Sequence, residues 1–368
     1  MLPIAAKEPK EGLPARIAKH LGMENGLAFA RGSAALYALL ANLAEKDGPG
    51  EVVIPALCCE SVALAAIYAG HEPRFAEVSS ESLCVTPKTI APLLSERTRA
   101  VLVVHLYGID AAIGNFTALR RAYPSVAFVE DIAHALGGYD RHGRLLGGGM
   151  DYTLLSFADS KIVSGDGGML LFSGKVPAES VNKINTLIPV TAPYMPSPGL
   201  ALSLRNLVHG LADLRREHPA ANVAPAFCAV AKNYRDLIVC SGGIGDAASV
   251  ATGFSGLDAV RISRYRNYVR YREGISIGHA KVVPLHKGST CWRCPVLFDE
   301  ADRARHITKA LRSAGIHASN HYFPLNLLIG GAPRPISEDV SSRIVNLWAD
   351  ERTPSSIVEG AINIINNC

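Results

Sequence analysis

The sequence has little of what marks a nucleic-acid binder or a membrane protein. Its formal net charge is only +4 over 368 residues, which is small for a dedicated nucleic-acid surface. The one basic run, over 261–272, alternates arginines with tyrosines, a pattern typical of a solvated helix face whose tyrosines pack inward. No stretch approaches the roughly 18 uninterrupted apolar residues of a membrane span. Because residues 1–12 also lack the charged start and apolar run of a secretory signal, we expect a soluble cytoplasmic protein with no nucleic-acid or membrane partner.

The eight cysteines form neither a disulfide framework nor a complete metal site. Cys58 and Cys59 are adjacent, which is poor geometry for a bridge. Cys291 and Cys294 have the spacing of half a zinc site, but no second pair accompanies them. They also fall in an expected strand over 290–298, where residues three apart point to opposite faces. We therefore expect reduced thiols and no bound metal.

What the chain does have is a large apolar fraction arranged in alternating strands and helices. Apolar residues make up 48% and charged residues 19%, enough for a substantial core. Strands are expected at 52–57, 73–78, 100–108, 127–131, 151–157 and 167–172, with helices at 34–44, 60–70, 86–94 and 113–122. The runs AVLVV and VAFVE are continuously apolar, as strands buried on both faces require. The sequence therefore predicts an α/β fold with a mostly parallel sheet.

The second half of the sequence is less regular. The path of 176–240 cannot be assigned from its pattern. Later signals, strands at 281–285 and 291–298 and helices at 300–314 and 355–366, predict a compact α+β unit. We divide the chain into a large domain, 1–255, and a helix followed by a small C-terminal α+β domain, 256–368.

Three strand or helix ends carry residues that together suit one cofactor. Asp131 ends a strand, Ser156 ends another, and Lys161 lies five residues later, while Gly32 and Ser33 begin a helix. Each has an ordinary explanation alone: a helix cap, an exposed lysine, or a simple helix start that fits no nucleotide-binding fingerprint. Ligands of parallel sheets bind at the carboxyl ends of the strands. A lysine, a carboxylate, a hydroxyl and a helix N-terminus at that edge are the parts of a pyridoxal-phosphate (PLP) site.

The same residues lie in motifs that resemble a known family. EDIAHALGG (130–138) and SFADSKIVSGDGGMLLF (156–172) resemble the DegT/StrS-type sugar aminotransferases, which are PLP enzymes of fold type I. Further segments keep the family's order, at 31–40, 52–78, 100–108 and 320–328. The resemblance covers most of 25–175 and returns over about 255–368. It implies a PLP-dependent transferase fold with a large cofactor domain and a small C-terminal domain.

The resemblance also implies a role for each matching residue. Lys161 would form a Schiff base with PLP and shuttle the proton, and Asp131 would pair with the pyridine nitrogen. His134 would lie near the ring hydroxyl. The phosphate would be held by Gly32, Ser33, Ala34 and Ser156, and the substrate would lie near His321 and Tyr322.

Two positions depart from the family pattern. The family places an aromatic residue over the cofactor ring, and the aligned residue here is Cys59. Loss of an aromatic stack costs about 0.5–1.5 kcal/mol, so it should weaken cofactor binding without abolishing it. The family's loop with Asn and Arg, which reaches the neighbouring subunit, is not recognisable at its place, 240–249.

The family implies a homodimeric aminotransferase with shared sites, moving an amino group from glutamate to a nucleotide-linked keto sugar or a related cyclitol. Lysine at 161 supports this reaction, because family members with histidine there resemble sugar dehydratases. Two alternatives stay open. One is a PLP-dependent elimination on a sugar, and the other is a catalytically degenerate partner subunit.

Overall fold

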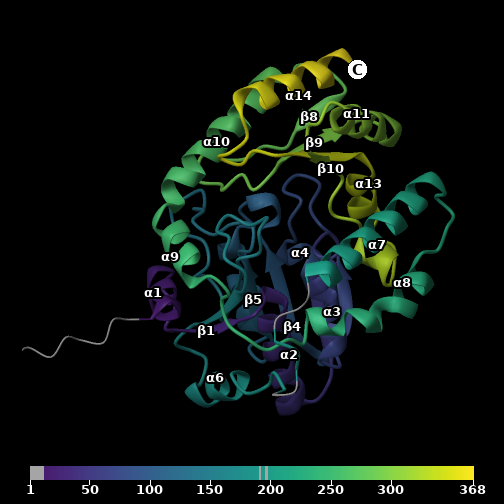
Figure 1. Ribbon diagram of the computed structural model, residues 1–368. Helices are drawn as coiled ribbons and strands as arrows, with labels where there is room; N and C mark the ends of the chain where they lie inside the picture. The colour runs from purple at the N-terminus through teal and green to yellow at the C-terminus, as the bar shows by residue number, and fades with distance from the viewer. Residues whose placement is uncertain (1–11, 190–191, 195–197) are drawn as a thin grey trace, which may run out of the picture.

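The computed structural model describes residues 12–189, 192–194 and 198–368, and its main layer is a seven-stranded sheet (Figure 1). The strand order is β1 (Asn25–Phe29), β7 (Gly168–Phe172), β6 (Tyr152–Ser156), β5 (Ala127–Asp131), β4 (Thr98–Val104), β2 (Glu51–Pro55) and β3 (Glu72–Ala76). Of these described strands only β7 runs opposite to the others, since it pairs antiparallel with β1 and β6. The predicted mostly parallel sheet is confirmed.

The apolar runs form strands because both faces of the sheet are covered. Val53 and Val101 lie in one buried cluster, while their neighbours Val52 and Ala100 lie in the other. Alternate side chains of one strand thus enter two separate cores. Helices α2 (Gly32–Asp47) and α3 (Glu60–Tyr68) contribute to the same cluster as Val52.

Several expected helices are confirmed with different boundaries. The segment expected at 86–94 forms α4 (Pro87–Ile90) and a 3-10 turn, with Thr86 as its cap in a reciprocal pair with Thr89. The helix expected over 113–122 begins as a 3-10 turn, and only α5 (Thr117–Ala122) is α-helical. The strand expected to reach residue 108 ends at Val104, followed by a 3-10 turn over Leu106–Gly108.

The stretch with no assignable path, 176–240, is largely helical where the structure describes it; 190–191 and 195–197 lie outside the described residues. It contains α6 (Ala178–Ile184), α7 (Pro198–Glu217), α8 (Ala224–Ala231) and a 3-10 helix over Lys232–Leu237. Helix α7 lies beside the sheet and close to the C-terminal part of the chain (Figure 1).

The C-terminal part is an α+β unit, as predicted. Helices α9 (Ala247–Ser255) and α10 (Leu257–Gly274) lead to an antiparallel sheet in the order β10 (Ala318–Ser319), β11 (Ile344–Leu347), β9 (Cys294–Phe298), β8 (Ala280–Val282). The accompanying helices are α11 (Ala301–Ser313), α12 (Leu325–Leu328), α13 (Pro335–Arg343) and α14 (Ser355–Asn367). The domain division at 255/256 stays a prediction.

Two local expectations in this part were wrong. The strand expected from residue 290 begins only at Cys294, because Cys291 has a φ of 48°, which extended backbone does not adopt. The basic run on α10 is not wholly solvated: Arg264 is buried and pairs with Glu351 at 2.9 Å, while Tyr268 and Tyr271 pack inward as expected. Among the described helices, none is both long and apolar enough to cross a membrane.

Candidate active site

The predicted site residues meet at one edge of the large sheet. Asp131 is the last residue of β5, Ser156 is the last residue of β6, and Lys161 follows in the connection to β7. Since β5 and β6 are parallel neighbours, their carboxyl ends lie side by side. The C-terminal part covers this edge (Figure 1).

The start of α2 is packed tightly against the end of β6. A Cβ added at Gly32 would lie 2.8 Å from the Leu155 carbonyl oxygen and 3.2 Å from Ser156 Cβ. A Cβ added at Gly168 would lie 2.2 Å from the backbone nitrogen of Gly32. Only glycines allow this approach, which brings the Ser156 side chain beside the first turn of α2.

That first turn has the properties of an anion site. No side chain caps the N-terminal end of α2, and the first N–H groups of a helix have no hydrogen-bond partner within the helix. Ser33 Oγ donates only a long bond, 3.4 Å, to the Leu237 carbonyl. Gly32, Ser33, Ala34 and Ser156 therefore form a cradle that fits a phosphate group.

Lys161 lies in a hydrogen-bonded group that joins both parts of the chain. Its Nζ is 3.0 Å from His134 Nε2, and the Tyr322 hydroxyl is 3.1 Å from the same nitrogen. The His134 ring stacks on Trp292 with centroids 3.8 Å apart and an interplanar angle of 3°. Trp292 Nε1 donates to the Ser160 carbonyl at 2.5 Å, which fixes the indole beside the lysine loop.

His134 is held neutral. Burial lowers its pKa well below the ordinary value, and the neighbouring Lys161 and Arg293 lower it further. A neutral imidazole carries one proton, on Nδ1 or on Nε2, and the contacts of Nε2 with Lys161 and Tyr322 are compatible with either position. Nδ1 is buried and has no partner among the described residues. A bound group or an ordered water would supply the missing hydrogen bond of Nδ1. This is one sign that the site fits a cofactor.

Asp131 is suited to hold a cation. It is buried, and one carboxylate oxygen accepts from the Ala133 N–H at 2.8 Å. No hydrogen bond from a described residue occupies the other oxygen. Burial raises the pKa of Asp131, while the Ala133 N–H and Lys161 lower it. A protonated ring nitrogen here would offset the cost of burying the charge.

The surroundings of Lys161 favour the neutral, nucleophilic form of its amine. Burial lowers the pKa of Lys161, and the positive charge of Arg293 acts in the same direction. Cys59 and Asp131 oppose the shift. A lysine whose pKa is lowered by burial is a nucleophile for carbonyl groups.

Comparison with known proteins matches part of the chain to one family. Residues 9–187 match the DegT/DnrJ/EryC1/StrS aminotransferase family. This match spans 179 of the 368 residues, just under half of the chain. A UDP-N-acetyl-3-dehydro-alpha-D-glucosamine 3-aminotransferase of Acidithiobacillus ferrooxidans is 34% identical over 162 residues, 43% of each chain. An L-glutamine:2-deoxy-scyllo-inosose aminotransferase of Streptomyces lividus is 30% identical over 188 residues, 50% of this chain and 44% of that one. The chain thus matches less than half the length of these relatives.

Solved structures are similar over almost the whole chain. DesV of S. venezuelae, in complex with a ketimine intermediate, has a TM-score of 0.73 at 20% identity, covering 96% of this chain and 87% of DesV. PseC of Helicobacter pylori, an aminotransferase involved in the biosynthesis of pseudoaminic acid, has a TM-score of 0.74 at 17% identity, covering 96% and 89%. These likenesses confirm the predicted fold type I of PLP-dependent transferases.

One departure from the DegT/StrS pattern, Cys59, lies near Lys161. Cys59 precedes α3, with its Sγ 3.1 Å from Ser61 Oγ. Burial and the neighbouring Glu60 raise the pKa of Cys59 to about 11, against the opposing effect of Lys161. Cys59 is thus a neutral thiol at pH 7, and the described structure has no aromatic ring at this position.

Sequence reasoning missed Trp292 and Arg293, although it noticed the CWRC segment for its cysteines. Cys291 and Cys294 are buried in the hydrophobic core. Arg293 lies between two indoles, 4.0 Å from the Trp292 ring and 3.8 Å from the Trp348 ring. An arginine flanked by tryptophan in an otherwise apolar segment was the available signal.

The two predicted substrate residues have different surroundings. Tyr322 contacts His134 and so lies with Lys161. His321 turns toward α7, where its Nε2 is 3.0 Å from His209 Nε2. Burial, then the neighbouring His209, lowers the pKa of His321 to about 3. Its carbonyl accepts from Asn346 Nδ2 at 2.6 Å and from the Tyr107 hydroxyl.

Proposed function

We propose that the chain is a PLP-dependent aminotransferase that moves an amino group from an amino acid to a keto sugar or related keto cyclitol. The observation that carries the proposal is the meeting of Lys161, Asp131 and the uncapped start of α2 at one sheet edge. Nδ1 of His134 adds a buried polar atom that has no partner among the described residues. The family match over residues 9–187 and the relatives' names support the reaction type.

Each residue has a distinct task in this proposal. PLP, when bound, supplies an aldehyde carbon that takes up the amino group and a ring that accepts electrons. Lys161 Nζ takes up and returns the proton that moves during transfer, and His134 Nε2 lies within hydrogen-bond distance of that amine. Asp131 keeps a proton on the ring nitrogen. The start of α2 and Ser156 hold the phosphate.

Arg293 is the residue we assign to the carboxylate of the amino donor, for which we propose glutamate. Its Nη1 donates to the Trp292 carbonyl at 2.8 Å, and no described carboxylate lies within ion-pair distance of it. Burial lowers the pKa of Arg293 to about 10, which still leaves it charged at pH 7. The charge lowers the pKa of His134, Lys161 and His321, and Arg293 packs on the Trp292 ring, which itself stacks on His134.

Replacing Arg293 should weaken donor binding selectively. For Arg293→Gln we expect the KM for glutamate to rise about 10- to 100-fold, since a hydrogen bond to a charged group contributes about 1.5–3 kcal/mol. The KM for the acceptor should change less than about twofold. Steady-state kinetics with each substrate varied in turn measures both. An unchanged glutamate KM would remove Arg293 from the donor site, and Arg293→Lys should recover part of the loss.

The missing aromatic residue gives a second prediction. Cys59→Phe should tighten PLP binding about two- to tenfold, because ring stacking adds about 0.5–1.5 kcal/mol. Cys59→Ser is the matched control that changes the side chain without adding a ring, and should leave the affinity within about twofold. Fluorescence titration of the apo protein with PLP measures the affinity. Weaker binding in Cys59→Phe would show that this position does not face the cofactor ring.

The proposal also includes a homodimer with shared sites, supported by the family resemblance. Light scattering tests the dimer, and a fully active monomer would reject it.

Adding PLP tests the reaction itself: we expect the absorbance band of lysine-bound PLP. With glutamate and an acceptor, keto acid should form in equal amount to aminated product. Keto product without net amino transfer would support elimination instead, and no turnover with any amino donor would support a degenerate partner subunit.

A further inference from the structure

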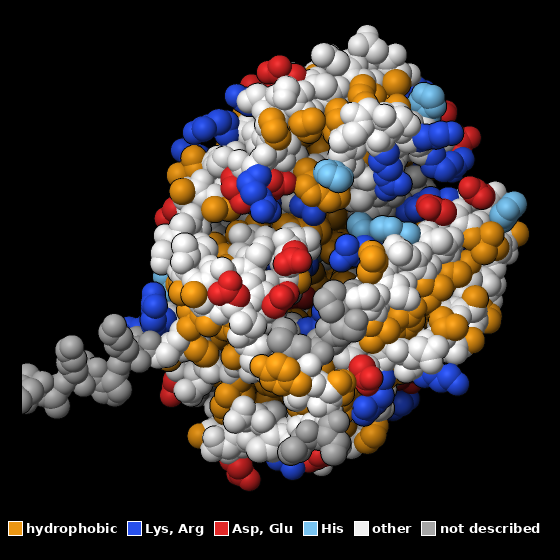
Figure 2. All heavy atoms as spheres, viewed as in Figure 1, with side chains coloured by type: hydrophobic (Ala, Val, Ile, Leu, Met, Phe, Trp, Pro, Cys, Tyr) orange, Lys and Arg blue, Asp and Glu red, His pale blue; other side chains and the backbone are white. Residues whose placement is uncertain are grey.

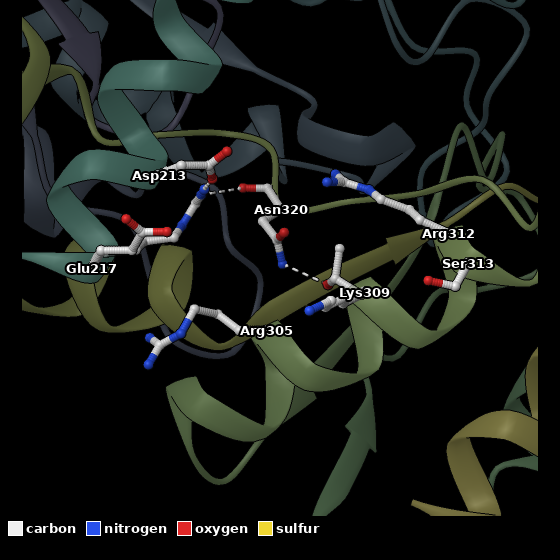
Figure 3. A pocket seen from close by; sticks show the side chains of 9 residues that line it. Asp213, Glu217, Arg305, Lys309, Arg312, Ser313 and Asn320 are labelled. Atoms are coloured by element: carbon white, nitrogen blue, oxygen red, sulfur yellow. Dashed lines mark hydrogen bonds and ion pairs between the residues drawn. The ribbon is translucent and has the colours of Figure 1, made fainter.

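Two histidines from distant segments meet near the candidate active site. His209 lies on α7, and His321 stands between Asn320 and Tyr322 in the chain. Their Nε2 atoms are 3.0 Å apart, and their ring centroids are 4.6 Å apart. Histidine and basic side chains gather in the hollow between α7 and the C-terminal part (Figure 2). In the cleft beside this contact, Asn320 lies between α7 and α11 (Figure 3). None of the tasks proposed above falls to His209.

Helix α7 lies outside the segment that matches the aminotransferase family. The match ends at residue 187, whereas α7 spans Pro198–Glu217, so the matched pattern gives no role to His209. His321, in contrast, belongs to the segment 320–328 that resembles a motif of the family. A residue from a helix outside the match therefore contacts a residue of a family-like segment.

The two imidazoles can form a hydrogen bond because both are neutral. A bond between two imidazoles needs an N–H on one ring and a lone pair on the other, and two protonated rings at this distance would repel each other. Burial lowers the pKa of His209, and arginines of α7 and α11 lower it further, against the effect of Asp213. Burial and His209 lower the pKa of His321 to about 3. The bond is therefore present at pH 7.

A series of ring contacts leads from His321 to the reactive lysine. The centroid of the His321 ring is 5.4 Å from that of Tyr322, and the Tyr322 centroid is 5.9 Å from that of His134. The Tyr322 hydroxyl is 3.1 Å from His134 Nε2, and this nitrogen is 3.0 Å from Lys161 Nζ. The His321 ring thus contacts both His209 of α7 and Tyr322 of the active site.

The C-terminal part holds the backbone of these two residues but not the His321 ring. The His321 carbonyl accepts from Asn346 Nδ2 at 2.6 Å, and the Tyr322 carbonyl accepts from Ser341 Oγ at 2.8 Å. These bonds fix the main chain, whereas the His321 ring can still adopt other rotamers. Among the described residues, the hydrogen bond with His209 is the one that fixes the direction of this ring.

We propose that His209 is a positioning residue for amino transfer, which acts by holding the His321 ring against Tyr322. The Tyr322 hydroxyl then stays beside His134, and His134 stays beside the reactive amine. A small displacement of a group near the reacting atoms lowers the rate, so a contact on α7 can affect a reaction that α7 does not touch. The inference rests on the proposed function, because it concerns the geometry around the amine that function requires.

His209→Leu removes the hydrogen bond and keeps a side chain of similar bulk. In the PLP-loaded protein we expect kcat to fall about three- to tenfold, the equivalent of one neutral hydrogen bond, with the KM for glutamate within about twofold. The pH midpoint of the lysine-bound PLP band should shift, because the neighbours of the amine move. His209→Gln should restore most of the rate, since its amide can donate or accept. Asn206→Leu, at an exposed position of α7, is the matched control and should change neither quantity.

A double variant shows whether His209 acts through Tyr322. Tyr322→Phe removes the hydroxyl and should by itself lower kcat and shift the midpoint. Adding His209→Leu should then change kcat by less than about twofold, because the contact it maintains is already lost. Effects that multiply in the double variant would overturn the proposal, as would unchanged kcat and midpoint in His209→Leu.

Near-ultraviolet circular dichroism of the protein without PLP gives a readout that does not depend on activity. The Tyr107 ring stacks with those of Trp292 and Tyr322, so His209→Leu should change this signal. Its thermal unfolding should match that of Asn206→Leu, and if it does not, the recovery by His209→Gln decides. An unchanged aromatic signal would overturn the proposal. A wild-type protein without the lysine-bound PLP band would reject the proposed function, whereas a changed aromatic signal in His209→Leu would still show that His209 holds these rings.

Discussion

Lys161→Ala should lower the rate of amino transfer by about 10³-fold or more, because the variant loses the amine that we propose moves the proton. The Nζ of Lys161 lies 3.0 Å from His134 Nε2, and no other described lysine side chain contacts His134. PLP should still bind through its phosphate and ring, so the spectrum should show free aldehyde instead of the lysine-bound band. Single-turnover kinetics with glutamate and the absorbance spectrum measure the two effects.

The control for this prediction is Lys175→Ala. Lys175 is exposed in the turn after β7, and its loss should leave both rate and spectrum unchanged. A small amine added to Lys161→Ala should restore part of the rate, since it replaces the missing proton carrier. Wild-type activity in Lys161→Ala would end the mechanistic proposal.

The positions of the candidate site residues were easiest to predict from the sequence where these residues end strands. Asp131 and Ser156 end adjacent parallel strands, so their meeting follows from the continuous apolar runs that precede them. The glycines at 32 and 168 also have a local signature, because the close approach of α2 to β6 permits no side chain. The strand ends could be predicted because each strand is buried on both faces, and a short continuous apolar run in the sequence marks it.

The sequence did not predict the parts of the site that depend on contacts between distant segments. His134 and Trp292 stack although 158 positions separate them, and no periodicity in either segment encodes that contact. It requires the C-terminal part to lie over the sheet edge. The CWRC segment has the cysteine spacing of a metal half-site, whereas in the structure its Trp292 ring lies 5.1 Å from Lys161 Nζ.

Helix α7 shows a different reason for a missed prediction. Its apolar residues Leu204, Val208 and Leu211 are buried at helical spacing, so a periodic signal was present. The polar side of the helix is broken by Gly210, and the preceding segment is rich in proline, which obscured it. The contacts of its polar side, such as that of His209 with His321, could not be predicted from the sequence. They depend on how distant segments pack in the whole fold.

Asp131→Asn should lower the rate of amino transfer about 10²- to 10³-fold, the usual effect of removing one preorganised electrostatic partner. Asparagine keeps the shape and the bond from the Ala133 N–H, but it cannot hold a proton on a ring nitrogen. Without that charge the ring accepts electrons poorly. PLP should still show the lysine-bound band, because Lys161 is intact. Asp159→Asn, in the exposed part of the same lysine loop, is the matched control and should leave the rate unchanged.

The pH dependence gives this prediction a second readout. Burial raises the pKa of Asp131 above the ordinary carboxyl value, so the carboxylate form is lost at a higher pH than for an exposed aspartate. Amino transfer by the wild type should therefore fall as pH decreases through that raised pKa, because protonated Asp131 no longer attracts the ring cation. In Asp131→Asn this acidic limb should disappear from the pH profile, leaving a low rate that does not depend on that group. An unchanged acidic limb in the variant would show that another group controls it and that Asp131 does not face the ring.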